Sequence, residues 1–124
     1  MISSDAVSVA YQLAKAYPTQ AGVISYTRRL EIANDGITLT EEIQQAAEQE
    51  LCWIFALAIA PRWGAEHACI VCPDFTMQCP KDMTCEIEHM DIDDPAAKGQ
   101  YENLWRVHLK RKSCRQTCAV FIIC

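Results

Sequence analysis

Apolar side chains repeat at helical spacing in the first third of the chain. The first apolar stripe consists of Val7, Ala10, Leu13, Ala14 and Tyr17. Ser4 or Asp5 can cap a helix that carries this stripe, and Pro18 would end it. A second stripe consists of Val23, Tyr26, Leu30 and Ala33, followed by Asn34-Asp35-Gly36, which tolerates the left-handed conformation found after helices. The pattern predicts two helices, the second beginning near Thr19.

A third helix is predicted from Thr40. Its hydroxyl can cap the helix, and the carboxylates of Glu41 and Glu42 meet the positive end of the helix dipole. One face then consists of Ile43, Ala46, Ala47, Leu51, Ile54 and Ala58. Residues 51–60 are apolar on all sides, which is typical of a helix at the centre of a bundle, and Pro61 ends the segment.

Residues 61–94 show no sustained period and are predicted to form a loop. A connection of this length is unusual in a compact domain unless something restrains it. Asp94-Pro95 then resembles the start of a fourth helix, with a capping residue before proline. One face of this helix consists of Tyr101, Leu104, Trp105, His108 and Lys112. The apolar tail from Ala119 to Ile123 fits either a strand or a last buried helical turn.

These elements predict a mainly α fold, a small helical domain of about four helices. Residues 1–124 would form one domain, with three helices in 1–60, a cysteine-rich loop in 61–94, and a basic helix with an apolar tail in 95–124. A length of 124 residues with 51% hydrophobic residues is enough to bury a core.

Eight cysteines raise the question of compartment. The N-terminal segment lacks the basic and apolar regions of a signal peptide, and the run from Leu51 to Ala60 is too short to span a bilayer, which takes about 20 residues. These features favour a cytoplasmic protein with reduced thiols and no membrane segment. A secreted domain with disulfides is the alternative.

The cysteines cluster within the predicted loop. Two residues between Cys69 and Cys72 allow both thiolates to reach one tetrahedral ion, so the segment predicts a structural zinc site. The expected ligands are Cys69, Cys72, Cys79, Cys85 and His89, with His67, Cys114 and Cys118 as alternatives. An iron–sulfur cluster, or disulfides with no cofactor, would use the same cysteines.

The spacing of four cysteines over residues 69–85 resembles the first half of the fungal binuclear zinc cluster. No second Cys-x2-Cys follows Cys85, and residues 73–78 lack the basic side chains that such modules place against DNA. The resemblance therefore implies no DNA-binding function for this chain.

Charge is divided along the chain. Residues 61–97 contain two Lys/Arg and eight Asp/Glu, whereas residues 98–124 contain six and one. These segments can attract each other within the fold or face a partner. The residues expected to contact a partner are Arg106, Lys110, Arg111, Lys112 and Arg115 on the basic side and Glu86, Glu88, Asp91 and Asp93 on the acidic side.

No complete catalytic motif accompanies these residues. The His-x-Glu and Pro-Cys-x-x-Cys pair of zinc deaminases is absent, and the four glycines form no phosphate loop. The sequence therefore predicts a non-catalytic protein–protein interaction or regulatory module, such as a small inhibitor from a mobile element or phage. Its partner would be a protein, and its oligomeric state is open. A nucleic-acid-binding zinc module using the basic helix, and a metal or redox enzyme using the cysteines, are the alternatives.

Overall fold

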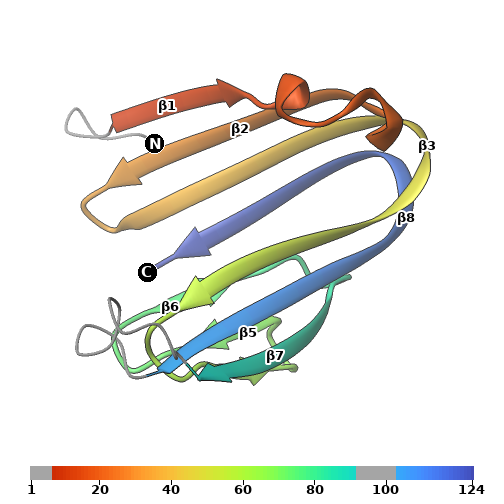
Figure 1. Cartoon of the computed structure of the whole chain (residues 1–124). Coiled ribbons are helices and arrows are strands. Elements are labelled where there is room, and N and C mark those ends of the chain that lie inside the picture. The colour runs from red at the N-terminus through yellow and green to blue at the C-terminus, as the bar shows by residue number, and fades with distance from the viewer. Residues whose placement is uncertain (1–6, 92–102) are drawn as a thin grey trace.

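The computed structural model describes residues 7–91 and 103–124, which form one antiparallel sheet of eight strands (Figure 1). The elements are β1 (Val7–Gln12), η1 (Ala14–Ala16), η2 (Thr19–Ala21), β2 (Val23–Ala33), β3 (Gly36–Leu57), β4 (Arg62–Gly64), β5 (Cys69–Val71), β6 (Thr76–Gln78), β7 (Thr84–Asp91) and β8 (Asn103–Ile123). The strand order is β1-β2-β3-β8-β6-β5-β4, and β7 also pairs with β8. The mainly α prediction is therefore wrong.

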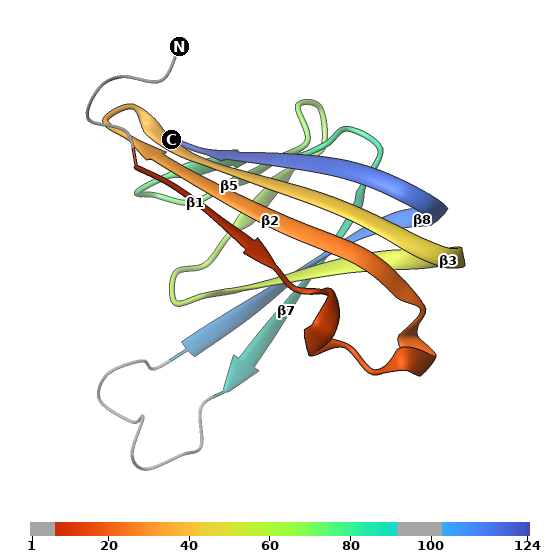
Figure 2. The same cartoon turned by 90° about the horizontal axis from the view of Figure 1, so that it is seen from above.

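Two very long strands, β3 and β8, give the molecule its shape. They pair along most of their length, but the register is irregular between Gln44 and Leu51. At that point both strands bend, so that the sheet folds over itself (Figures 1 and 2). The first layer contains β1, β2, residues 36–45 of β3 and residues 116–123 of β8. The second layer contains residues 51–57 of β3, residues 103–111 of β8, and β7.

Burial in the strands follows a period of two. In β3, Glu41, Ile43 and Gln45 are buried, whereas Glu42 and Gln44 between them are exposed. This alternation is the mark of a strand with one face toward a core. Of these buried residues only Ile43 belonged to the predicted helical face, and Ala46, Ala47 and Ile54 of that face are exposed.

The segment with the strongest local helical composition is the bend itself. Residues 44–50, Gln-Gln-Ala-Ala-Glu-Gln-Glu, consist of good helix formers. In the structure residues 46–50 are exposed and lie where the ladder is irregular. Tertiary pairing on both sides overrides the local preference here, which is why the predicted third helix is a strand.

The predicted loop and fourth helix are also strands. Residues 61–94 contribute β4, β5, β6 and all of β7, and the apolar tail continues β8 to Ile123. The predicted helix start at Asp94-Pro95 and the Ser4 or Asp5 cap lie outside the described residues. Within the described ranges, the two short 3-10 turns are the only helical segments, and neither is long or apolar enough to cross a membrane.

Asn34 and Asp35 form the turn of the β2–β3 hairpin, with Ala33 and Gly36 paired across it. Gly36 has a φ of 152°, and an added Cβ there would lie 2.3 Å from the carbonyl oxygen of Ile123. Glycine is thus required for the close approach of β8. The predicted chain reversal at this point is present, although it joins strands rather than helices.

The core lies between the two layers. Trp53 and Phe55, from the second layer, make edge-on contacts with Phe121, from the first, at ring-centroid distances of 5.9 Å and 5.4 Å. The other buried apolar residues include Ile43, Ile70, Met77, Val107, Leu109 and Ala119. Packing across the fold therefore holds the bent sheet closed at this point.

Candidate functional site

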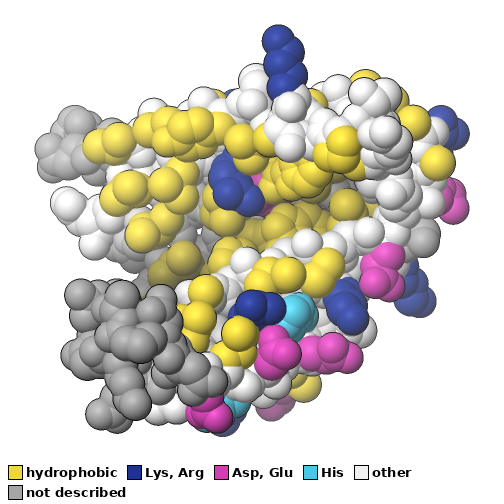
Figure 3. All heavy atoms as spheres, viewed as in Figure 1, with side chains coloured by type: hydrophobic (Ala, Val, Ile, Leu, Met, Phe, Trp, Pro, Cys, Tyr) yellow, Lys and Arg dark blue, Asp and Glu magenta, His cyan; other side chains and the backbone are white. Residues whose placement is uncertain are grey.

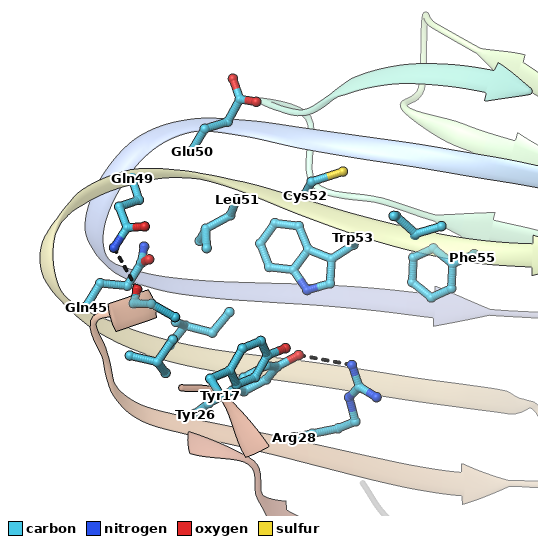
Figure 4. A pocket seen from close by; sticks show the side chains of 14 residues that line it. Tyr17, Tyr26, Arg28, Gln45, Gln49, Glu50, Leu51, Cys52, Trp53 and Phe55 are labelled. Carbon is cyan, nitrogen blue, oxygen red and sulfur yellow. Dashed lines mark hydrogen bonds between the residues drawn. The ribbon is translucent and has the colours of Figure 1, made fainter. Parts of the chain in front are cut away.

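A groove opens between the two layers beside the bend (Figure 3). Its volume is about 400 Å³. One wall is β2 with the η1–η2 segment, the floor is the bend of β3, and the other wall is residues 51–55 of β3 (Figure 4). The space-filling view shows hydrophobic side chains over most of this hollow.

Aromatic rings line the groove. Tyr17 stacks on Tyr26 with ring centroids 5.9 Å apart. Trp53 and Phe55 face them from the opposite wall (Figure 4). The η1–η2 segment that carries Tyr17 is tied to the bend, because Ala46 donates its N–H to the carbonyl of Gly22 at 2.8 Å and the Gln49 amide donates to Ala21 at 3.0 Å. The groove is thus formed by restrained elements.

An ion pair between a buried carboxylate and a partly exposed guanidinium lies beside the groove. Glu41 is 0% exposed, and its Oε1 accepts a hydrogen bond from Nε of Arg28 at 2.7 Å. Nη2 of Arg28 also lies 2.7 Å from this oxygen and donates to the Tyr26 hydroxyl at 3.0 Å. The second carboxylate oxygen of Glu41 is buried without a hydrogen-bond partner. The charge on Arg28 is therefore held by an internal carboxylate.

This environment shifts two pKa values. Burial raises the pKa of Tyr26 to about 12, and the negative charge of Glu41 adds to the effect. Burial opposes the charge of Arg28, but the hydrogen bond and charge of Glu41 raise its pKa above the ordinary value. At neutral pH Arg28 is therefore a cation and Tyr26 a neutral phenol.

The structure does not bring the predicted metal ligands together into one site. Among the described residues, which include all the predicted ligands, no three His, Cys, Asp or Glu side chains lie close enough together to hold a metal. Cys69 donates to the Gln78 side chain at 3.1 Å, whereas Cys72 and Cys79 are buried in the core. The residues present therefore do not form a tetrahedral zinc site in this arrangement.

All eight cysteines are free thiols. Burial raises the pKa of Cys79 to about 12, with contributions from the neighbouring Cys85 and Cys69. Burial, followed by the charge of a nearby acid, raises the pKa of Cys72 beside Asp74 and of Cys85 beside Glu86. Raised values disfavour the thiolate, which is the reactive form of cysteine.

The fifth expected ligand, His89, and the three alternative ligands also lie apart. His89 is in β7, where it forms a hydrogen bond of 2.7 Å with Asn103 and packs against Trp105. His67 lies in the exposed turn between β4 and β5. Cys114 and Cys118 are in the second half of β8, pairing with Gln49 and Glu42 of β3.

Four of the nine predicted partner-binding residues pair with one another. Across β7 and β8, Glu86 lies 3.7 Å from Lys110, and Glu88 lies 3.8 Å from Arg106 and 3.5 Å from His108. Figure 3 shows acidic, basic and histidine side chains together over the second layer. The opposite charges of the two segments are thus paired within the fold.

The remaining charged residues are placed differently. Arg111 is mostly buried at the bend of β8, where Nη2 donates to Asp82 at 2.8 Å and Nη1 donates to the Cys118 carbonyl and the Thr117 hydroxyl. Its Nε lies 2.8 Å from Asp82 without the alignment of a hydrogen bond. Arg115 donates to the carbonyl of Ala46. Lys112 and Asp91 are exposed, and Asp93 lies outside the described residues.

The sequence analysis did not identify the Arg28–Glu41 pair. A signal existed: if Asn34-Asp35 is taken as a two-residue hairpin turn, Arg28 falls directly opposite Glu41, as the register shows. A second signal was the alternation of Leu51, Trp53, Phe55 and Leu57.

No protein-family model matches this chain, and no curated protein sequence matches it. The functional argument therefore depends on the geometry of the groove.

Proposed function

We propose that this protein is a non-catalytic protein–protein interaction module that holds an apolar segment of a partner protein in the groove. The observation that carries the proposal is the groove itself, an open aromatic-lined hollow built on restrained elements. Exposed aromatic side chains such as Tyr17, together with buried ones such as Trp53, are typical of the centres of protein interfaces. An inhibitory role would be one form of such binding.

The placement of charges favours a protein partner over a nucleic acid. Binding to phosphate backbones depends on unpaired Lys and Arg side chains. Here Arg106, Lys110 and Arg111 each lie near an acidic side chain. The partner-contacting surface is therefore better placed in the groove than on the charged segments.

The ion pairing of Arg28 and the raised thiol pKa values favour a binding role over a catalytic one. Arg28 is engaged by Glu41, and the pKa values of three thiols are raised, so these groups are poorly disposed as acids, bases or nucleophiles at neutral pH. Exposed free thiols at Cys52, Cys118 and Cys124 favour a reducing compartment such as the cytoplasm.

Selection from a library of short unstructured peptides, displayed on phage, tests the proposal. We expect selected peptides to be rich in apolar and aromatic residues and to lose at least about tenfold in affinity for the Tyr17→Glu variant, a change of about 1.4 kcal/mol. Tyr17 is 46% exposed, so this substitution adds a charge to the groove without opening the core.

Val120→Glu is the matched control. Val120 is 40% exposed, in β8, and is not among the residues that line the groove. We expect its peptide affinity to equal that of the wild type. If no peptide is selected, or if the selected peptides bind Tyr17→Glu as tightly as the wild type, the groove is not a protein-binding site and the proposal is wrong.

A further inference from the structure

The second half of β3 has a free edge. Residues 36–45 of β3 lie between β2 and β8, whereas residues 51–57 pair with β8 alone among the described residues. Five consecutive residues, 51–55, line the groove. Because successive side chains of a strand point to opposite faces, a groove lined by consecutive residues meets the strand at its edge. Backbone N–H and C=O groups of this edge therefore face the groove.

The first layer extends past this edge. The register aligns Val9 with Leu30, Leu39 and the core residue Phe121, so that these residues share the inner face. Toward β1 this face remains exposed. Its exposed apolar residues include Val7, Val9, Tyr11 and Ile32. An inner sheet face is thus uncovered where the second layer stops.

The composition of the free edge favours pairing. Residues 51–57, Leu-Cys-Trp-Ile-Phe-Ala-Leu, contain no charge and no proline. The opposite edge of the same layer, β7, contains Glu86, Glu88, His89 and Asp91. Charged residues are the usual means by which an edge strand avoids pairing with another chain, and residues 51–57 lack them.

We propose that the partner supplies an extended segment that pairs as an additional strand with residues 51–57 of β3 and lies beneath β2. This inference rests on the proposed function and specifies its mode. The added strand extends the second layer, gives hydrogen-bond partners to the edge, and covers the exposed inner face of the first layer. The segment has apolar residues at alternate positions, because only every second side chain faces the first layer.

Other occupants fit the groove less well. A lipid or another apolar molecule offers no partners for the backbone groups, and burying them unpaired is costly. A second copy pairing through the same edge would bring its own overlying first layer into the space that β1 and β2 already fill. An extended polypeptide provides hydrogen-bond partners for the backbone groups of the edge and fits in the space beneath the first layer.

Backbone N-methylation of a selected peptide tests the pairing. N-methylation removes one N–H donor and leaves the side chain unchanged. We expect affinity to fall at least about tenfold at every second position of the peptide and to change little at the positions between, because the donors of a strand alternate in direction. Hydrogen exchange measured by NMR should show that, within residues 51–57, the amides that point away from β8 become protected only after the peptide is added, whereas the amides that pair with β8 are protected throughout.

Ile32→Asp tests whether the inner face of the first layer packs against the added strand, and Ile122→Asp is its matched control. Ile32 is 42% exposed on the inner face, whereas Ile122 is 40% exposed on the opposite face of the first layer. We expect peptide affinity to fall with Ile32→Asp alone.

The outcomes separate the two proposals. Peptides that depend on Tyr17 but tolerate N-methylation at every position would leave groove binding intact and refute strand addition. Amides of residues 51–57 that point away from β8 and are protected before any peptide is added would also refute it, because the free edge would then already be paired. Sedimentation that shows a dimer at the concentrations of the binding assay would assign the edge to a second copy and overturn the proposal.

Discussion

At the scale of single residues, the ion pair between the partly exposed Arg28 and the buried Glu41 is expected to matter for stability. Glu41 is 0% exposed and depends on Arg28 for compensation of its charge. Its second carboxylate oxygen is already without a partner. Removing one member of such a pair costs more than removing both, because it leaves an uncompensated charge in the interior.

We expect Arg28→Met to lower the free energy of unfolding by about 3 kcal/mol, and the double variant Arg28→Met/Glu41→Leu to recover most of that loss. Urea denaturation at neutral pH measures both. Arg29→Met, at the exposed neighbouring position, is the control and should change stability by less than about 0.5 kcal/mol. A double variant as unstable as the single one would show that the two residues do not compensate each other.

Tyr26 should titrate late among the four tyrosines. Its pKa in the folded state is about 12, against an ordinary value of 10.0, so folding favours the protonated phenol. The stabilisation is present below about pH 10 and is lost as the pH rises toward 12. Tyrosinate absorbance should therefore include a late step that disappears in Tyr26→Phe. A late step that persists in this variant would assign it to another tyrosine.

At the scale of elements, the bends of β3 and β8 position the groove. Arg111 holds the bend of β8 through Asp82, Thr117 and the Cys118 carbonyl. Arg115 and Gln45 link the two bends, by hydrogen bonds to the carbonyls of Ala46 and Cys114. Side chains therefore replace part of the ladder that the bend interrupts.

We expect Arg111→Met to destabilise the fold by about 1 to 3 kcal/mol, because several charge-assisted hydrogen bonds of a mostly buried guanidinium are lost. Lys110→Met is the comparison, since its 3.7 Å contact with Glu86 is exposed and should contribute less than about 1 kcal/mol. Thermal or urea denaturation gives both values. Equal losses of stability in the two variants would show that Arg111 does not stabilise the bend.

The stability of the fold at acid pH should also depend on Arg111. The Arg111 guanidinium holds the pKa of Asp82 below its usual range. That contribution is present above the ordinary carboxyl pKa and is lost as the pH falls through the lowered value.

The sequence located the chain reversal at Asn34-Asp35, but it assigned the wrong period and with it the wrong faces: Ile54, expected on the apolar face of the third helix, is 57% exposed. Residues 44–50 are helix formers by composition, and pairing with β2 and β8 on both sides of the bend holds them extended. The groove could not be predicted, because it depends on where two strands bend together. The alternation of Leu51, Trp53 and Phe55 was available and would have predicted a half-buried strand.

At the scale of the whole molecule, the rate at which each cysteine reacts should depend on its burial in the fold. Three cysteines are exposed (Cys52, Cys118 and Cys124), whereas Cys72 and Cys79 are buried. A thiol reagent at mildly alkaline pH should modify the exposed three first and Cys79 last, because burial both hides the sulfur and raises its pKa. Cys52→Ser should remove one fast thiol and Cys79→Ser one slow thiol.

Elemental analysis of the same sample tests the zinc prediction directly. Since no three His, Cys, Asp or Glu side chains of the described residues lie close enough together to hold a metal, we expect no stoichiometric zinc. One zinc per chain together with four slow thiols among Cys69, Cys72, Cys79 and Cys85 would restore that prediction and require a different arrangement of residues 69–85.

The continuity of β3 and β8 through both layers has a consequence for how the chain folds. Their ladder runs from the pair Leu57–Trp105 to the pair Ile37–Ile123, so its partners are distant in sequence throughout. The β1–β2–β3 meander can form from local contacts, whereas β8 must close a long loop before it gains any pairing. Neither layer can be completed without β8, and the chain should therefore fold slowly and in a single cooperative step.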